Sequence, residues 1–223
     1  MTASSPLQAS SAQAPRALDD FLARAAARLS QVPPAPYAAD SHATLNGDHA
    51  LGGHGQVNDK PPRPAAVLVA VVARPEPTVL LTLRSTTLSA HAGQIAFPGG
   101  RRDPEDKDEV ATALREAREE VGLAASLVRP LGFLDGYLSS THFWIVPVVG
   151  LVQPDYALTL NPAEVQEAFE VPLSFLMTPA NHQRQSLMRD GVKRQFYAMP
   201  YEGRFIWGVT AGLLRNLYER VYA

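Results

Sequence analysis

The 223-residue sequence contains no cysteine, which excludes disulfide bonds, zinc sites built on thiolates and a cysteine nucleophile. Its formal net charge is −2, so basic residues are not in excess. The sequence therefore lacks the positive charge that typically attracts nucleic acid or an anionic membrane. No apolar run is long enough to span a bilayer, and the first residues lack the basic and apolar segments of a signal peptide. These absences predict a cytoplasmic protein that binds neither nucleic acid nor membrane.

The N-terminal part differs in composition from the rest. Residues 1–15 are rich in Ser, Ala, Gln and Pro, which predicts disorder, and apolar residues at helical spacing predict one amphipathic helix over 16–30. Residues 32–64 are rich in Pro, Gly, His and Asp, as in a linker. We therefore expect an N-terminal extension, largely disordered, over 1–62 and one domain over 63–223.

The predicted domain alternates strand and helix signals. Apolar, β-branched runs predict a strand pair over 65–73 and 78–83, further strands over 131–134 and 144–152, and a hairpin around Asp190-Gly191. Residues 165–177 mix helical and turn signals, and apolar spacing from Ile206 to Val221 predicts a C-terminal helix. Mixed strands with a helix on each side predict an α/β fold, specifically an α/β/α sandwich with a mixed β-sheet.

Three carboxylates recur at one-turn spacing in a predicted helix over 104–121. Glu116, Glu119 and Glu120 share a helix face, where like charges repel. Asp103 is the predicted N-cap, with Pro104 at the first helical position and Gly122 as the C-cap. A solvated charged face is the simpler interpretation. A glycine turn directly before the helix favours a loop–helix–loop that holds Mg²⁺ or Mn²⁺ against a phosphate substrate.

Residues 100–123 resemble the Nudix box, the signature of hydrolases that cleave a nucleoside diphosphate linked to another group. The segment 115–123, REAREEVGL, matches the end of the box throughout. The start departs from it, because Gly100 lies fifteen rather than fourteen positions before Arg115. The usual glutamate position is Lys107, and Asp106 is the nearest acid.

That departure looks like the variant box of the Nudix coenzyme A diphosphatases, in which an Asp-x-x-Asp run follows the two glycines, here Asp103 to Asp106. Their upstream motif also has a counterpart here, in LLTLRS at 80–85 and GQIAFPGG at 93–100. One position that is often basic in that subfamily is Ser89 in this chain. The resemblance implies a Nudix-type fold with a catalytic loop–helix–loop, and metal-dependent hydrolysis of coenzyme A or acyl-coenzyme A to 3′,5′-ADP and (acyl-)4′-phosphopantetheine.

The resemblance also implies roles for individual residues. The metal ligands would be Glu116, Glu120, Glu119 as a third, and a backbone carbonyl of Gly100 or its neighbour Gly99. Arg115 would orient a glutamate. The general base would be Glu164 or Glu116, and the phosphate-binding candidates are Arg84, Arg63 and His91.

Two alternatives stay open at this point. The same chemistry could act on ADP-ribose, NADH or a nucleoside triphosphate, although the upstream motif argues against these substrates. A non-catalytic Nudix domain could instead sense a nucleotide, although such domains typically lose box glutamates that this chain keeps. The expected partner is a small nucleotide substrate, and a homodimer is left open.

Overall fold

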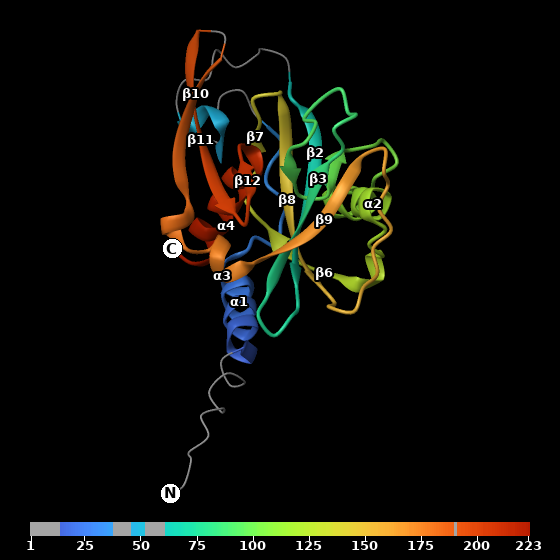
Figure 1. The fold of residues 1–223 in the computed structure, drawn as a ribbon. Coiled ribbons are helices and arrows are strands. Elements are labelled where there is room, and N and C mark those ends of the chain that lie inside the picture. Colours follow the sequence, from blue (N-terminus) through green and yellow to red (C-terminus); the bar gives the residue numbers. More distant parts are fainter. Residues whose placement is uncertain (1–13, 38–45, 52–60, 190) are drawn as a thin grey trace, which may run out of the picture.

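A mixed β-sheet forms the centre of the molecule in the computed structural model, which describes residues 14–37, 46–51, 61–189 and 191–223. Its main strand order is β1-β7-β8-β2-β3-β4, with β5 beside β2, β6 beside β8 and β9 beside β3. β2 runs parallel to β8 and antiparallel to β3 (Figure 1). The strands of this sheet are β1 Asn46–Gly47, β2 Arg63–Val72, β3 Thr78–Arg84, β4 Ile95–Ala96, β5 Gly99–Arg101, β6 Val128–Phe133, β7 Tyr137–Leu138, β8 Phe143–Val152 and β9 Val165–Pro172.

A smaller antiparallel sheet and four α-helices complete the described fold. The small sheet has the order β10-β11-β12, with β10 Gln183–Arg189, β11 Val192–Tyr201 and β12 Arg204–Trp207. The α-helices are α1 Ala14–Arg28, α2 Glu109–Val121, α3 Leu173–Leu176 and α4 Val209–Val221. Short 3₁₀ turns occupy Asp48–Leu51, Ala125–Leu127 and Pro179–Asn181. None of the helices described is both long and apolar enough to cross a membrane.

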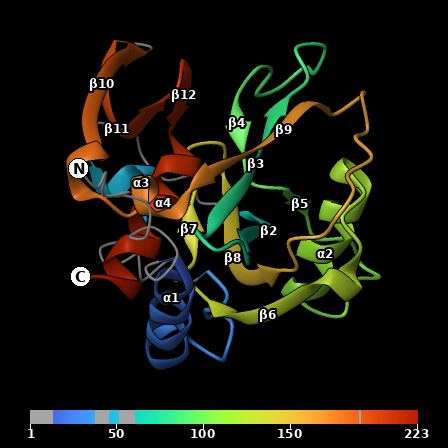
Figure 2. The same ribbon diagram turned by 60° about the horizontal axis from the view of Figure 1, so that its bottom comes forward.

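Two hydrophobic cores sandwich the large sheet. Successive strand residues point to opposite faces, so Val69 and Val71 of β2 join the core shared with α1 and α4. Leu68 and Ala70 join the core shared with α2. Figure 2 shows α1 and α4 on one side of the sheet and α2 on the other. The α/β/α sandwich with a mixed sheet is therefore confirmed.

Local sequence patterns predicted most elements but misplaced some boundaries. The β2–β3 pair and the β10–β11 hairpin are confirmed. Residues 165–172 form strand β9, paired with β3 along its length, where the sequence showed helical and turn signals. Ile206 lies in β12 rather than in the last helix, which begins at Val209. In both cases strand pairing decides the conformation, of β9 with the distant β3 and of β12 with its neighbour β11, and periodicity alone does not reveal this pairing.

The N-terminal helix packs against the domain. Phe21 and Ala25 are fully buried in the core shared with α4, and Ser30 pairs with Phe133 of β6. The predicted helix over 16–30 is thus confirmed as α1. The division of the chain at residue 62 stays a prediction. Of residues 1–15, which were predicted to be disordered, 1–13 lie outside the described residues.

Candidate functional site

The two glycines that the sequence predicted as a turn directly before the helix lie instead in strand β5, where Gly99 and Gly100 pair with Val67 and Ala66 of β2. A Cβ on Gly99 would lie 2.6 Å from the carbonyl oxygen of Ala66, and one on Gly100 would lie 2.5 Å from Cδ of Glu116. Both distances are shorter than any real Cβ contact. Glycine is therefore required at position 99, where the clash is with backbone, whereas at position 100 a side chain would displace the Glu116 carboxylate, which lies directly against Gly100.

Helix α2 begins later than the sequence indicated. Asp108 is the N-cap, its side chain accepting a hydrogen bond from the N–H of Ala111 at 2.7 Å, so the prediction of Asp103 as N-cap and Pro104 as first helical residue is wrong. Asp103 and Asp106 instead close a tight turn, in which the N–H of each donates to the other residue. The C-cap prediction is confirmed, since Gly122 adopts the left-handed conformation at φ 73°.

Asp106, the acid nearest to the usual box glutamate position, is bound by Arg115. Its buried carboxylate accepts two hydrogen bonds from the Arg115 guanidinium, at 3.0 and 2.9 Å, and one from the Thr112 hydroxyl at 3.0 Å. The hydrogen bonds from Arg115, helped by the N–H of Asp103 and by Thr112, hold the pKa of Asp106 far below its usual range. Asp106 and Thr112 were absent from the predicted site. The sequence signals for Asp106 were the one-residue displacement of the acid in the box and the Asp-x-x-Asp run from Asp103 to Asp106.

Arg115 also reaches the carboxylates of its own helix. Its Nη1 donates to Glu116 and to Glu119, both at 2.9 Å, while its Nη2 donates to the Arg101 carbonyl at 3.0 Å. Glu119 is half-exposed, whereas the Glu116 side chain is mostly buried. The arginine thus holds the Glu116 carboxylate by a charge-assisted hydrogen bond, and its role in orienting a catalytic glutamate stays a prediction.

Glu116 and Glu120 are carboxylates with raised pKa values. Burial raises the pKa of Glu116 against the opposing effect of Arg115, and the charges of Glu119 and Glu164 raise it further. Glu120 is only 2% exposed. Burial, opposed by the Gly99 N–H and Arg84, together with the charges of Glu116 and Glu164, raises the pKa of Glu120 to about 7.

Two residues from other parts of the chain join this cluster. Arg84, at the end of β3, places Nη1 3.4 Å from Oε1 of Glu120, and its buried Nε has no hydrogen-bond partner. Glu164 precedes β9, and its charge acts on both Glu116 and Glu120. The fold therefore brings Arg84 and Arg115 to a group of four carboxylates. We call this group the carboxylate cluster: Glu116, Glu119 and Glu120 of α2, and Glu164.

The two remaining predicted residues make their contacts elsewhere. Arg63 stacks over the Phe143 ring at 3.9 Å and donates to the Thr141 carbonyl at 3.2 Å. His91 lies exposed in the loop between β3 and β4, with Nδ1 2.9 Å from Oε1 of Gln94. Their role in binding a phosphate stays a prediction.

The donor chemistry of the cluster fits a divalent ion. Glu120 accepts a hydrogen bond from the Gly99 N–H at 3.1 Å, and Glu116 rests on Gly100, so the buried carboxylates and the glycine backbone share one surface. Within the described ranges, no three acidic or histidine side chains already form a metal-binding group. Arg115 pairs with Glu116, and Arg84 pairs with Glu120. Two buried carboxylates beside the backbone of Gly99 and Gly100 nonetheless offer the oxygen ligands that Mg²⁺ and Mn²⁺ prefer.

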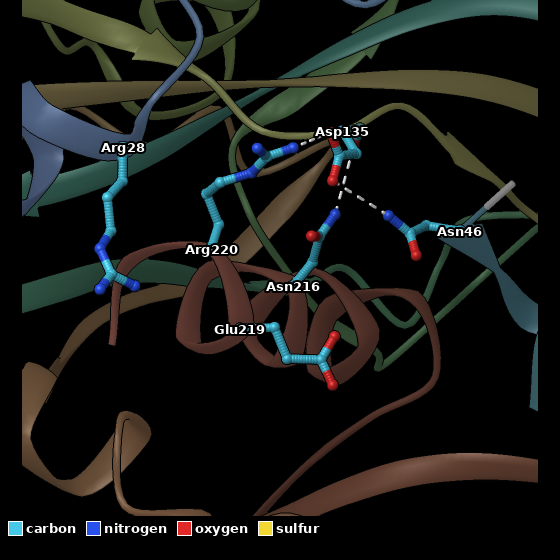
Figure 3. Close-up of a pocket in the computed structure, with 6 residues that line it drawn as sticks. All are labelled: Arg28, Asn46, Asp135, Asn216, Glu219 and Arg220. Carbon is cyan, nitrogen blue, oxygen red and sulfur yellow. Dashed lines mark hydrogen bonds and ion pairs between the residues drawn. The ribbon is translucent and has the colours of Figure 1, made fainter. Parts of the chain in front are cut away.

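A separate hollow of about 480 Å³ lies beside α4, lined by residues outside the cluster. Asp135 is its centre, where it pairs with Arg220 and accepts hydrogen bonds from Asn46 and Asn216 (Figure 3). Glu219 pairs with Arg215 at 2.7 Å. The carboxylates of Asp135 and Glu219 are thus both paired with arginines. We therefore place the candidate reactive site at the carboxylate cluster.

Comparison with known proteins gives a concordant picture. The family model for the NUDIX domain matches residues 62–191. A Yersinia pestis protein described as "Uncharacterized Nudix hydrolase NudL" is 44% identical over 159 residues, covering 71% of this chain and 80% of its own.

Solved Nudix structures resemble the chain at low identity. The Nudix hydrolase of Alicyclobacillus acidocaldarius is 20% identical with a TM-score of 0.45, over 73% of this chain and 93% of its own. DR0079 from Deinococcus radiodurans is 17% identical with a TM-score of 0.46, over 72% and 83%. With the family model covering more than half of the residues and a close relative covering most of them, the chain belongs to the Nudix hydrolases.

Proposed function

We propose that this Nudix hydrolase cleaves the diphosphate bond of coenzyme A or acyl-coenzyme A. Hydrolysis of a nucleoside diphosphate derivative follows from the family. The observation that carries the finer assignment is the position of Arg84. This arginine belongs to the upstream motif LLTLRS, and its guanidinium lies at the carboxylate Glu120, thirty-six residues away in sequence. That position supports a role for the motif in binding the diphosphate that the cluster would cleave.

The metal would be Mg²⁺ or Mn²⁺, since Nudix hydrolases generally use divalent ions. Glu116, Glu119, Glu120 and the carbonyl of Gly100 would hold it. When bound, the ion would neutralise charge on the phosphate oxygens and lower the pKa of a nearby water. Arg115, itself held by Asp106, would keep the Glu116 carboxylate against Gly100.

The reaction is the addition of water across a phosphorus–oxygen bond. The water oxygen attacks one phosphorus of the diphosphate, the bridging oxygen leaves with the other phosphate, and Glu164 accepts the proton of the water. Glu164 suits this role because its charge already acts on Glu116 and Glu120. Glu116 remains the alternative base. The products are 3′,5′-ADP and 4′-phosphopantetheine, or its acylated form.

Positive side chains would bind the phosphates of the substrate. Arg84 presents a guanidinium with an unpaired, buried Nε beside the cluster. A guanidinium can bind phosphate through two parallel hydrogen bonds. Arg63 and His91 are proposed to contact the 3′-phosphate or the diphosphate from the edge of the site.

The test is an end-point assay of coenzyme A, ADP-ribose and NADH with Mg²⁺ and with Mn²⁺, with products separated by chromatography. Release of 3′,5′-ADP from coenzyme A, faster than cleavage of the other two, is the expected result. Preference for ADP-ribose or NADH would overturn the substrate assignment while leaving the Nudix chemistry intact. Failure to hydrolyse any of them would favour a nucleotide-sensing domain. Sedimentation of the purified protein would test the homodimer.

A further inference from the structure

The segment that carries Glu164 is attached to the C-terminal end of α2. The N–H of Thr159 donates to the Val121 carbonyl at 3.0 Å, and the N–H of Asn161 donates to the Glu120 carbonyl at 2.9 Å. These carbonyls belong to the last turn of the helix, where no intrahelical donor remains. A Cβ on Gly122 would lie 2.9 Å from the Thr159 nitrogen, so the segment also packs closely on the helix cap.

Asn161 connects this attachment to the Glu164 side chain. Its Nδ2 donates to Oε1 of Glu164 at 3.3 Å, and its Oδ1 accepts from the N–H of Ala163 at 3.2 Å. Its carbonyl accepts from the N–H of Glu164 at 3.0 Å and of Val165 at 2.8 Å. One residue therefore bonds the backbone of Glu120 on one side and both the backbone and the carboxylate of Glu164 on the other.

A second attachment holds Glu164 from the side of β3. The N–H of Ser85 donates to the Glu164 carbonyl at 2.8 Å, directly after Arg84. The backbone of Glu164 is thus fixed between α2 and the end of β3. A fixed backbone does not by itself stop the Glu164 side chain from rotating. The hydrogen bond from the Asn161 amide restricts that rotation. A base must lie within hydrogen-bond reach of the proton it removes, so this restriction bears on the rate.

We propose that Asn161 is a positioning residue that holds the Glu164 carboxylate in place relative to Glu120. The inference rests on the proposed role of Glu164 as general base. Asn161 touches neither substrate nor reacting atoms and acts only through Glu164. Loss of its amide should lower kcat and leave both KM and the metal concentration for half-activation close to their wild-type values.

The experiment is a double-mutant cycle with Asn161→Ser, Glu164→Gln and the double variant. Serine keeps an oxygen that can accept from the Ala163 N–H, but its side chain is too short to reach Glu164. We expect Asn161→Ser to lower kcat about 10-fold or more, Glu164→Gln to lower it further, and the double variant to match Glu164→Gln alone. Non-additivity of this kind is not produced by a general loss of structure.

A matched control is Asn181→Ser. Asn181 also donates through Nδ2, to the Phe175 carbonyl at 2.9 Å, in a turn away from the cluster. It should keep wild-type kcat. Thermal unfolding of every variant checks the fold, and Asn161→Asp, which keeps the acceptor and removes the donor, replaces Asn161→Ser if the latter does not fold.

The outcomes separate the two proposals. If coenzyme A is not cleaved but ADP-ribose or NADH is, the substrate assignment fails and the same cycle is run on the cleaved compound. If Glu164→Gln keeps wild-type kcat, or if Asn161→Ser lowers the rates of wild type and Glu164→Gln by the same factor, the positioning role is overturned. A protein that cleaves none of these compounds also overturns it.

Discussion

Two glutamates of this molecule, the partly buried Glu170 and the buried Glu120, have opposite environments. Glu170 of β9 accepts hydrogen bonds from Nε and Nη2 of Arg74 at 2.6 and 2.5 Å, from the Tyr156 hydroxyl at 2.6 Å, and from Thr78. Burial alone would raise its pKa, but these donors outweigh burial and lower the pKa of Glu170 to about 2. Glu120 is more deeply buried, has one backbone N–H and a longer contact to Arg84, and lies among like charges that raise its pKa.

The difference separates a stabilising carboxylate from a reactive one. A fully bonded carboxylate contributes to folding, since its ionised form is favoured in the native state. A buried carboxylate with few donors and like-charged neighbours costs stability and is retained where it performs chemistry. The contrast therefore supports a structural role for Glu170 and a metal-binding role for Glu120.

The largest expected effect is that of Glu120→Gln on activity. We expect kcat to fall about 10³-fold, because the substitution removes a ligand that would stabilise transition-state charge. The metal-free protein should at the same time become more stable at pH 8, by about 1–3 kcal/mol. The native pKa of about 7 lies above the ordinary value of 4.5, so the stability of the wild type falls as pH rises from 4.5 through 7. Steady-state rates and urea unfolding at pH 5 and pH 8 measure both effects. Lower stability of the variant at pH 8 would contradict the comparison.

Glu170→Gln should show the opposite behaviour. We expect a loss of about 2–3 kcal/mol in the free energy of unfolding at pH 7, with kcat per folded molecule unchanged. The native pKa of about 2 lies below 4.5, so this stabilisation is complete above pH 4.5 and disappears as pH falls toward 2. Urea unfolding of wild type and variant between pH 3 and pH 7 gives the difference. A constant difference over this range would show that ionisation of Glu170 is not its source.

Gly100→Ala tests the contact between Gly100 of β5 and the Glu116 carboxylate. The added methyl group would overlap the Glu116 carboxylate, so we expect kcat to fall about 10- to 100-fold with little change in stability. Gly203→Ala is the matched control, since its Cβ would meet nothing within 4 Å. Its left-handed backbone, at φ 77°, should make it less stable while its kcat stays at the wild-type level. Equal losses of activity in both variants would remove the special role of Gly100.

The smallest expected effect concerns metal affinity and pH. An ion that binds Glu120 must displace its proton, and at pH 6 a group with a pKa of about 7 is mostly protonated. Mg²⁺ or Mn²⁺ should therefore raise the melting temperature more at pH 8 than at pH 6, corresponding to about tenfold tighter binding. Thermal scans of chelator-treated protein with added metal measure this difference. An equal shift at both pH values would indicate that Glu120 is not a ligand.

Sequence patterns predicted the geometry of the candidate site where the interactions are local. The three helix carboxylates, Arg115 and the Gly122 cap lie on a single helix, so their spacing specifies their geometry. The helix start was misplaced because Asp103-Pro104 has the residue types of a cap, whereas Asp103 and Asp106 form a turn that presents Asp106 to Arg115. No local pattern distinguishes these two uses of an aspartate.

By itself, the sequence determined the β2–β3 and β10–β11 pairs, the carboxylate face of α2 and the absence of cysteine chemistry, because each follows from residue type and short-range spacing, and its resemblance to the Nudix box indicated the family. Only the tertiary structure decided that Arg84 lies at Glu120 and that Asn161 links Glu120 to Glu164. These contacts join segments brought together by sheet pairing and core packing. Their pKa effects depend on burial, which the linear order of residues does not specify.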